Sequence, residues 1–324
     1  MVSQYPLDDL KEYLRRRINI KENYDALLRF PRYFEIETVN HCNAHCPICT
    51  VNDWKRQSGL MSDHVFDKIA EEITTPENTQ QIIRVSLFRD GEPLLDKKLS
   101  ERIARLKNGG IKHVSITTNV SLLDPKRAMS LLDSKLDSIV FSLDSIHKET
   151  YELIRVGLNY EEVMNNALNF IRMRDESKAK TKIQVRMTRQ QLNKSEWNEF
   201  HAFWRNNLRE QDRVFYHDVH NWGGQNIAVS LLQQSGQIHL PCVALWSLCV
   251  IFANGDIPLC NVDYMNNHGN GNVMNQSIYN LWNSPLIQQR RQDHLNGNKG
   301  KITLCQTCNA WEEPSDSKNI MSHY

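Results

Sequence analysis

Short apolar runs alternate with segments of helical periodicity along the first two thirds of the chain. Six runs are rich in β-branched residues and bounded by turn-forming residues, which predicts buried strands. They occupy residues 33–39, 82–88, 113–118, 138–143, 182–188 and 213–219. Strands that alternate with helices are joined by crossovers and lie parallel in one sheet. The pattern therefore predicts an α/β fold.

Helix signals fill the segments between these strands. Ser62 is placed to cap a helix that runs to about Glu72, and Asp124-Pro125 is a typical helix start. Further helices are expected over 97–108, 160–175 and 195–208. Ahead of the first strand, apolar residues at helical spacing within 5–30 predict a leading amphipathic helix that packs on the main domain.

The periodicity changes after Gly224, where short apolar runs and turns replace the alternation of strands and helices. Asn254-Gly255 between two apolar runs indicates a β-hairpin. We therefore expect a helical extension over 1–31, a main domain over 32–228 and a small C-terminal domain over 229–324.

Composition narrows the class of protein. The 324 residues include 39 Lys and Arg against 38 Asp and Glu, for a formal net charge of +1. Such a balance creates no field that attracts nucleic acid or an anionic membrane, so neither is expected as a partner. No apolar run approaches membrane-spanning length, and the first residues lack the basic and apolar regions of a signal peptide. We expect a cytoplasmic protein.

Eight cysteines fall into two groups, and in a reducing compartment they are expected to be metal ligands or free thiols. The first group, Cys42, Cys46 and Cys49, follows the first strand. Three thiols at this spacing can ligate three irons of a [4Fe-4S] cube and leave the fourth iron open. Structural zinc prefers four ligands, so zinc would also need His41 or His45.

The loop Cys42-Asn-Ala-His-Cys46-Pro-Ile-Cys49 resembles the CxxxCxxC signature of the radical S-adenosylmethionine (SAM) enzymes, with aliphatic Ile48 where the family often has an aromatic residue. The resemblance implies a partial (β/α)6 barrel, open on one side, with SAM bound at the open iron. It also implies that the reduced cluster cleaves SAM to start hydrogen-atom abstraction. A flavodoxin or ferredoxin would supply the electron.

Residues at strand ends should gather on one rim of a parallel barrel. Asp90-Gly91-Glu92-Pro93 follows the second strand and resembles the family's GGEP motif, with Asp90 in place of the first glycine. An ammonium group requires fixed acceptors beside the cluster. The resemblance therefore places Gly91, Glu92 and Pro93 at the amino group of SAM.

Further site residues also follow strands. The resemblance places Asn119 and Ser142 near the ribose and methionyl groups of SAM, although capping or turn chemistry explains both equally well. Arg155 matches an arginine that follows the fourth strand in relatives and can hold the SAM carboxylate by two hydrogen bonds. His220, after the sixth strand, is a candidate substrate contact, with a structural histidine as the alternative.

The second cysteine group resembles the twitch form of the SPASM extension of these enzymes, which holds one auxiliary [4Fe-4S] cluster. The resemblance assigns the ligands as Cys242, Cys260, Cys305 and Cys308. Four thiolates would close this cluster, which would then carry electrons rather than bind SAM. A zinc ribbon would use the same four residues. Cys249 is left over, either as a buried apolar residue or as a hydrogen-atom donor.

The resemblance is to the aminocyclitol dehydrogenase type, which implies oxidation of a sugar or aminocyclitol carbinol with the auxiliary cluster as electron acceptor. Three alternatives stay open. An epimerase would use Cys249 to return a hydrogen atom to a small-molecule substrate. A maturase would modify a ribosomal peptide, although the segment before the first strand is short for a peptide-recognition domain. A non-catalytic zinc-binding module would contain no iron.

Overall fold

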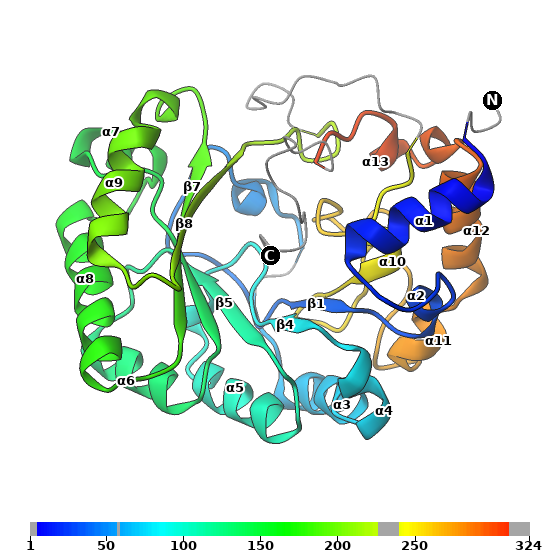
Figure 1. The fold of residues 1–324 in the computed structure, drawn as a ribbon, viewed down its shortest axis with the longest axis horizontal. Helices are drawn as coiled ribbons and strands as arrows, with labels where there is room; N and C mark the ends of the chain where they lie inside the picture. Colours follow the sequence, from blue (N-terminus) through cyan, green and yellow to red (C-terminus); the bar gives the residue numbers. More distant parts are fainter. Residues whose placement is uncertain (1–4, 57–58, 226–239, 311–324) are drawn as a thin grey trace.

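The computed structural model describes residues 5–56, 59–225 and 240–310. One curved, parallel sheet has the strand order β8-β7-β6-β5-β4-β1-β9 (Figure 1). Its strands are β1 (Tyr33–Ile36), β4 (Arg84–Ser86), β5 (Val114–Thr118), β6 (Ser138–Ser142), β7 (Lys182–Arg189), β8 (Arg213–Asp218) and β9 (Leu248–Ile251). Six of the seven coincide with the expected runs, so the predicted α/β fold is confirmed.

Helices cover the outer face of the sheet (Figure 1). They are α3 (Asp63–Ile73), α4 (Pro76–Gln81), α5 (Leu99–Asn108), α6 (Pro125–Asp133), α7 (Lys148–Ile154), α8 (Tyr160–Glu176) and α9 (Trp197–Asn207). Ser62 caps α3 by accepting a hydrogen bond from the N–H of Val65, as expected. The sequence analysis did not anticipate α4 and α7. Helix α4 has the same start signal, because Thr75 caps it just before a proline.

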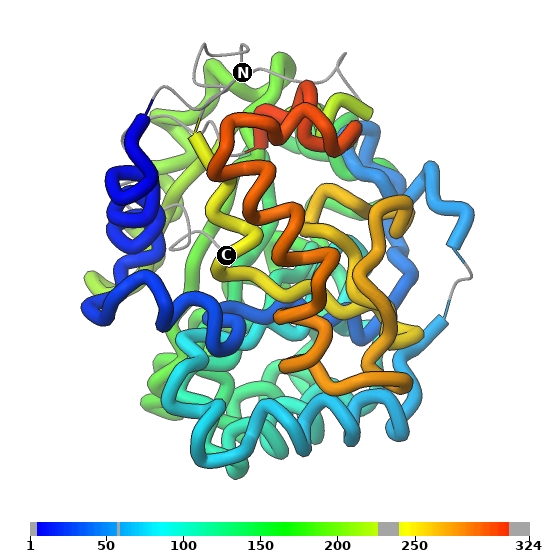
Figure 2. Tube along the Cα trace, turned by 90° about the vertical axis from the view of Figure 1, so that its right-hand side faces the viewer, coloured from blue at the N-terminus to red at the C-terminus, as the bar shows by residue number. Residues whose placement is uncertain are grey.

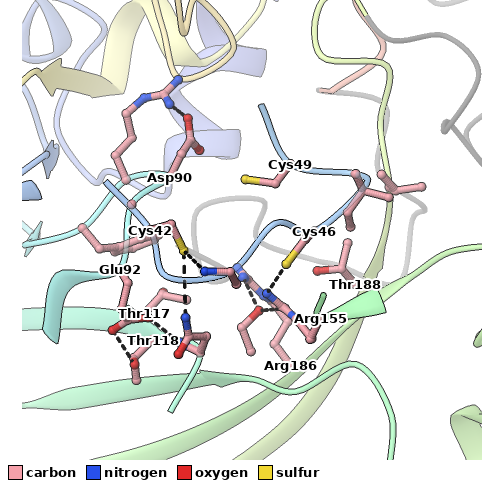
Figure 3. Close-up of a pocket in the computed structure, with 18 of the residues that line it drawn as sticks. Cys42, Cys46, Cys49, Asp90, Glu92, Thr117, Thr118, Arg155, Arg186 and Thr188 are labelled. Atoms are coloured by element: carbon pink, nitrogen blue, oxygen red, sulfur yellow. Dashed lines mark hydrogen bonds and ion pairs between the residues drawn. The ribbon is translucent and has the colours of Figure 1, made fainter. Parts of the chain in front are cut away.

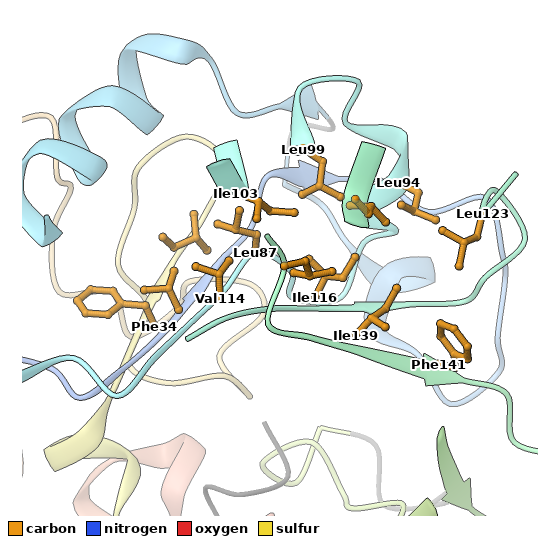
Figure 4. Close-up of a cluster of buried hydrophobic side chains, with 14 of the residues drawn as sticks. Phe34, Leu87, Leu94, Leu99, Ile103, Val114, Ile116, Leu123, Ile139 and Phe141 are labelled. Atoms are coloured by element: carbon orange, nitrogen blue, oxygen red, sulfur yellow. The ribbon is translucent and has the colours of Figure 1, made fainter. Parts of the chain in front are cut away.

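A continuous hydrophobic core lies between the sheet and these helices (Figure 4). Ile116 of β5 and Ile139 and Phe141 of β6 are completely buried in it. Successive side chains of a strand point to opposite faces, and Thr117 of β5 accordingly lines a cavity on the inner side. The sheet thus presents apolar side chains to the helices and polar ones to the cavity.

The N-terminal helices pack mainly against the C-terminal part of the chain. Helices α1 (Leu7–Ile18) and α2 (Ala26–Arg29) share a second hydrophobic cluster with residues 243–262 and 295–304. Trp246 is fully buried there and donates a hydrogen bond of 2.7 Å from its indole N–H to the hydroxyl of Tyr24. Figure 2 shows α1 beside this C-terminal region. The expectation that the leading helix packs on the main domain is corrected accordingly.

Strand β9 extends the main sheet although it belongs to the C-terminal third of the chain. It pairs in parallel with β1, with Phe34 opposite Cys249 and Glu35 opposite Val250. The expected hairpin is therefore wrong in its pairing. Gly255, with φ of +88°, does close a tight turn by donating its N–H to the carbonyl of Phe252, but the residues beyond the turn form only an isolated bridge, from Asp256 to Asn272.

The expected domain boundary between residues 228 and 229 lies outside the described residues. The remaining elements are mostly short. They are the antiparallel pair β2 (Val39–Asn40) and β3 (Gly59–Leu60), α10 (Ala244–Ser247), α11 (Ile278–Trp282), α12 (Pro285–Leu295), α13 (Thr303–Gln306), η1 (Thr50–Asp53), η2 (Pro93–Leu95), η3 (Lys194–Glu196) and η5 (Lys299–Lys301). Among the helices that the structure describes, none combines the length and apolar character required to cross a bilayer.

Candidate functional site

A cavity opens where the parallel strands end, inside the curve of the sheet. It contains about 1120 Å³ of space with its open mouth included. Cys42, Cys46 and Cys49 all line it (Figure 3). The three thiols expected to bind one cluster are therefore brought together at the rim that the topology predicts.

The cysteine loop provides thiols that suit a metal cluster. Burial raises the pKa of Cys42 to about 11 and that of Cys49 to about 12, so each thiolate needs positive charge beside it. Irons of a cluster supply that charge, and the three residues fit the open-site [4Fe-4S] arrangement. The exposed His41 and His45 do not line the cavity. In the described parts of the chain, no three His, Cys, Asp or Glu side chains lie close enough to share a single metal ion.

Gly91 allows the segment after β4 to approach the backbone that leads into the cysteine loop. A Cβ at this position would lie 2.6 Å from the carbonyl oxygen of His41, which no side chain can tolerate. The next residue, Glu92, donates its backbone N–H to that same carbonyl at 2.9 Å. The glycine of the GGEP-like motif is therefore needed for close backbone contact with the cluster-binding loop.

Glu92 ties this segment to the end of β5. Its carboxylate accepts hydrogen bonds from the hydroxyl of Thr118 at 2.7 Å, the N–H of Asn119 at 2.8 Å and the N–H of Leu94 at 3.1 Å. Burial raises its pKa to about 6 despite these donors. The side chain lines the cavity but is already held by three donors. In this arrangement Glu92 positions the loop, whereas Pro93 starts η2 and does not line the cavity.

Asn119 joins β5 to the cysteine loop. Its side-chain amide donates to the oxygen of Asn43 at 2.9 Å and approaches the sulfur of Cys42 at 3.9 Å. Its own oxygen accepts from the hydroxyl of Ser121. Asn119 thus lines the cavity with its polar groups directed at the loop. Asn119 therefore lies beside the cysteine loop, and its expected contact with SAM stays a prediction.

Arg155 and Ser142 meet beside the cysteine loop, at the end of the neighbouring strand β6. Arg155 forms an ion pair with the fully buried Asp144 at 2.7 Å and donates to Ser142. It also approaches the sulfur of Cys46 at 3.7 Å (Figure 3). Arg186 of β7 also donates to Ser142, at 2.8 Å. The guanidinium group of Arg155 is thus held beside the cysteine loop by a carboxylate that the sequence analysis did not identify.

Replacement of Asp144 by Asn is expected to lower the free energy of unfolding by about 3 kcal/mol, because it leaves the mostly buried Arg155 without its counter-charge. Urea denaturation of the metal-free chain measures this change. Glu176→Gln is the matched control, since Glu176 and its partner Arg172 are both more than half exposed. Its effect should stay within about 0.5 kcal/mol. Equal effects of the two substitutions would contradict the assigned ion pair.

Asp90 departs from the GGEP pattern and has partners in the structure. It forms an ion pair with Arg89 and accepts a hydrogen bond from the hydroxyl of Thr50. Arg89 in turn donates to the carbonyl of Asn261, the residue that follows Cys260. Arg89, Asp90 and Asn261 all line the cavity. This chain of contacts connects the front loop with the second cysteine group.

The loop after β8 carries His220 into the same cavity. The N–H of Trp222 donates to Nδ1 of His220 at 3.0 Å, so the neutral ring carries its proton on Nε2. Burial lowers the pKa of His220 to about 4. The indole N–H of Trp222 donates to the carbonyl of Ile48, next to Cys49. His220 can therefore present a hydrogen-bond donor to a substrate while its loop contacts the cluster-binding loop.

The second cysteine group also comes together. Burial, followed by the nearby thiols of Cys305, Cys242 and Cys308, raises the pKa of Cys260 well above its usual value. Four thiols that disfavour one another's ionisation suit a closed cluster, because bound irons would reverse that cost. Asn221, next to His220, donates to the carbonyl of Thr307 at 2.6 Å and so ties this cysteine group to the cavity wall.

Cys249 does not reach the cavity. It lies in β9 opposite Phe34, and both side chains belong to the core between sheet and helices. The next pair of the same register, Glu35 and Val250, has Glu35 on the cavity side. The hydrogen-donor role expected as one alternative for Cys249 required a thiol at the barrel mouth. The structure places it on the wrong face of the sheet.

Several cavity residues were missed by the sequence analysis. They are Glu35, Arg89, Thr117, Thr118, Arg186, Thr188 and His217. Most of them lie in strands or directly after them, on the face that alternates with the apolar core. Counting alternate positions back from each strand end could have identified Thr188 and His217.

Comparison with protein families and curated proteins agrees with this geometry. The model of the radical SAM superfamily matches residues 36–177, and that of the SPASM iron-sulfur cluster-binding domain matches residues 242–309. A probable GTP 3',8-cyclase of Methanococcus maripaludis (strain C5) is 37% identical over 133 residues, which cover 41% of this chain and 43% of that protein. A GTP 3',8-cyclase of Limosilactobacillus fermentum is 33% identical over 153 residues, or 45% and 43% of the two chains. The chain thus matches less than half the length of these relatives.

Solved structures share the fold. BtrN in complex with AdoMet and 2-DOIA has a TM-score of 0.60 at 19% identity, with 86% of this chain and 93% of that chain covered. Streptococcus suis SuiB bound to the precursor peptide SuiA has a TM-score of 0.64 at 18% identity, with 86% and 70% covered. The two family matches and the two cysteine groups identify the chain as a member of the radical SAM superfamily, whose members bind SAM and a [4Fe-4S] cluster, with a C-terminal SPASM-type iron-sulfur domain.

Proposed function

We propose that this protein oxidises a carbinol of a small sugar-like or aminocyclitol-like molecule by removing two hydrogens. The observation that carries the proposal is that one cavity is lined both by Cys42, Cys46 and Cys49 and by Asn261, the neighbour of Cys260. A substrate in this cavity lies between the two cysteine groups. When bound at these sites, SAM with its cluster supplies one-electron abstraction of a hydrogen atom, and the auxiliary cluster supplies an acceptor for a single electron.

The side chains of the cavity suit a polyhydroxylated molecule. Thr117 and Thr188 offer hydroxyl groups, and His220 offers an N–H donor. We assign Asn119 and Arg155 to the SAM side, because Asn43 holds the first and the buried Asp144 holds the second, which leaves the His220 side for substrate. Such fixed donors and acceptors orient one C–H bond and exclude water. We propose a flavodoxin or ferredoxin as the electron donor.

The alternatives differ in what they need from the cavity. Epimerisation needs a hydrogen-atom donor, and Cys249, the thiol considered for that role, faces the core. Peptide modification shares the first chemical step, and SuiB was solved with a precursor peptide. The test must therefore distinguish a small-molecule substrate from a peptide. GTP is included among the test compounds because curated relatives are named GTP 3',8-cyclases.

The test is anaerobic incubation of the reconstituted protein with SAM and dithionite, in the presence of cyclitols, aminocyclitols, aminosugars or GTP. We expect 5'-deoxyadenosine together with a product two hydrogens lighter than an aminocyclitol or aminosugar. Mass spectrometry separates this result from epimerisation, which leaves the mass unchanged. A product of unchanged mass, or turnover with GTP alone, would refute the proposed oxidation.

A further inference from the structure

Oxidation of a carbinol to a ketone leaves one proton without an acceptor among the residues described so far. The hydrogen on carbon leaves as an atom, the remaining electron passes to an iron-sulfur acceptor, and the C–O bond becomes C=O. The hydroxyl hydrogen must then leave as a proton. Because the cavity is enclosed on several sides by the sheet and the two loops, a side chain of its wall is the natural acceptor.

We propose that Glu35 of β1 accepts this proton, which rests on the oxidation proposed above. Glu35 lines the cavity, is 3% exposed, and its Oε1 has no hydrogen-bond partner among the described residues. A buried carboxylate oxygen without a donor is costly in a folded protein. Because Glu35 lies in the cavity wall, this oxygen can accept a proton from a bound substrate.

The other carboxylates of the cavity already have partners. Asp90 is held by the ion pair with Arg89 and by the hydroxyl of Thr50. Glu92 accepts three hydrogen bonds. The ring of His220 carries its proton toward the cavity, because its other nitrogen accepts from the backbone. Among the described carboxylates that line the cavity, Glu35 is thus the one with a buried oxygen that lacks a hydrogen-bond partner.

The charges around Glu35 suit a group that must lose a proton again. Burial raises its pKa to about 7, and Arg89 and Arg84 limit this rise. Glu37 lies just beyond the end of β1 and is paired with Arg56 at 2.8 Å, while Ser86 and Val250 lie opposite Glu35 on the two flanking strands. A pKa near neutrality lets one group accept and release a proton at cellular pH.

Arg89 gives the proton transfer a connection to the second cysteine group. The positive charge of Arg89 limits the rise in the pKa of Glu35, and the nearby thiol of Cys260 opposes the lowering of the Arg89 pKa by burial. When Glu35 takes up a proton it loses its negative charge, whereas an electron acceptor beside Cys260 gains one. The guanidinium group of Arg89, which donates to the carbonyl of Asn261, lies where it can balance both changes.

The first test reads the protonation of Glu35 directly, in the full chain with or without its clusters. Infrared difference spectra of protein labelled with [13C]glutamate are recorded between about pH 5.5 and pH 8.5, a range that brackets the expected pKa of Glu35. We expect two protonated-carboxyl components that disappear as the pH rises, one from Glu92 near pH 6 and one from Glu35 near pH 7, and the second should be missing in Glu35→Gln. Persistence of the second component in Glu35→Gln would overturn the proposal whatever the activity.

The second test uses an aminocyclitol, scyllo-inosamine, that carries deuterium on its carbinol carbons. Glu35→Gln should still transfer deuterium into 5'-deoxyadenosine, within about threefold of the wild type, but form ketone about 100-fold more slowly. The rise of wild-type ketone formation through about pH 7 should vanish in Glu35→Gln and return in part in Glu35→Asp. Ketone formation by Glu35→Gln at the wild-type rate and pH profile would refute the role of Glu35.

Two further variants separate the possible causes of failure. Glu37→Gln removes a nearby carboxylate, just beyond the end of β1, that is paired with Arg56, so it should lower thermal stability without changing the pH profile. If His217→Gln abolishes the pH-dependent limb and Glu35→Gln keeps it, the acceptor is His217 and the proposal is wrong. Absence of deuterium transfer in the wild type, with scyllo-inosamine and every other compound tested, would instead refute the proposed oxidation itself.

Discussion

A Cys46→Ala chain is expected to form no detectable 5'-deoxyadenosine when it is incubated anaerobically with SAM and dithionite. Cys46 is the middle cysteine of the loop in sequence, is buried in the cavity wall and lies 3.7 Å from the guanidinium group of Arg155. With only Cys42 and Cys49 left, the loop offers two ligands to a cluster that needs three. Chromatographic assay of 5'-deoxyadenosine and iron analysis of the same sample measure the loss.

The matched control is Cys249→Ala. This variant removes a thiol of similar burial that faces the core rather than the cavity, so iron content and SAM cleavage should both stay at the wild-type level. The expected effect of this substitution is a lower thermal stability, because a small buried side chain has been shortened. Wild-type 5'-deoxyadenosine formation by Cys46→Ala would show that the loop does not hold the catalytic cluster.

Site residues that follow the ends of strands can be predicted from the sequence. Alternation of strands and helices requires a parallel sheet, and parallel strands bring their carboxyl ends to one rim. Asn119, Ser142 and the cysteine loop could therefore be placed together before any coordinates, and the structure has them lining one cavity. His220 followed from the same rule.

Residues inside strands are harder to place, because the face to which they point depends on register. Cys249 and Glu35 illustrate the problem: they lie in neighbouring strands and face opposite sides of one sheet. The sequence of the first strand, Tyr-Phe-Glu-Ile-Glu, does place Glu35 and Glu37 on one face. Only the pairing of β1 with β9 shows that Cys249 faces away from them.

Contacts between distant segments could not be predicted at all. The sequence around Asn221 reads as a glycine-containing turn, yet its side chain holds Thr307, 86 residues later. The amphipathic pattern of helix α1 predicts which face is buried, but it does not predict which segment that face packs against. Its partners, among them Trp246 and Leu295, come from the C-terminal part of the chain. Only tertiary packing decides such choices.

Replacement of Cys305 by Ala is expected to separate SAM cleavage from substrate oxidation. The auxiliary group would lose one of its four thiols, and the chain should contain about four fewer irons. The front loop keeps its three cysteines, so 5'-deoxyadenosine should still form with an aminocyclitol present, whereas the product two hydrogens lighter should fall below detection because the substrate electron has no acceptor.

The control for this experiment lies in the same segment. Thr307→Ala keeps all four thiols and also keeps the backbone carbonyl that accepts the hydrogen bond from Asn221, so it should retain both iron and oxidation. The comparison distinguishes loss of an electron acceptor from simple loosening of the loop that carries His220. If Cys305→Ala formed the oxidised product at the wild-type rate, the electron would have another destination, and the cavity between the two cysteine groups would no longer account for the chemistry.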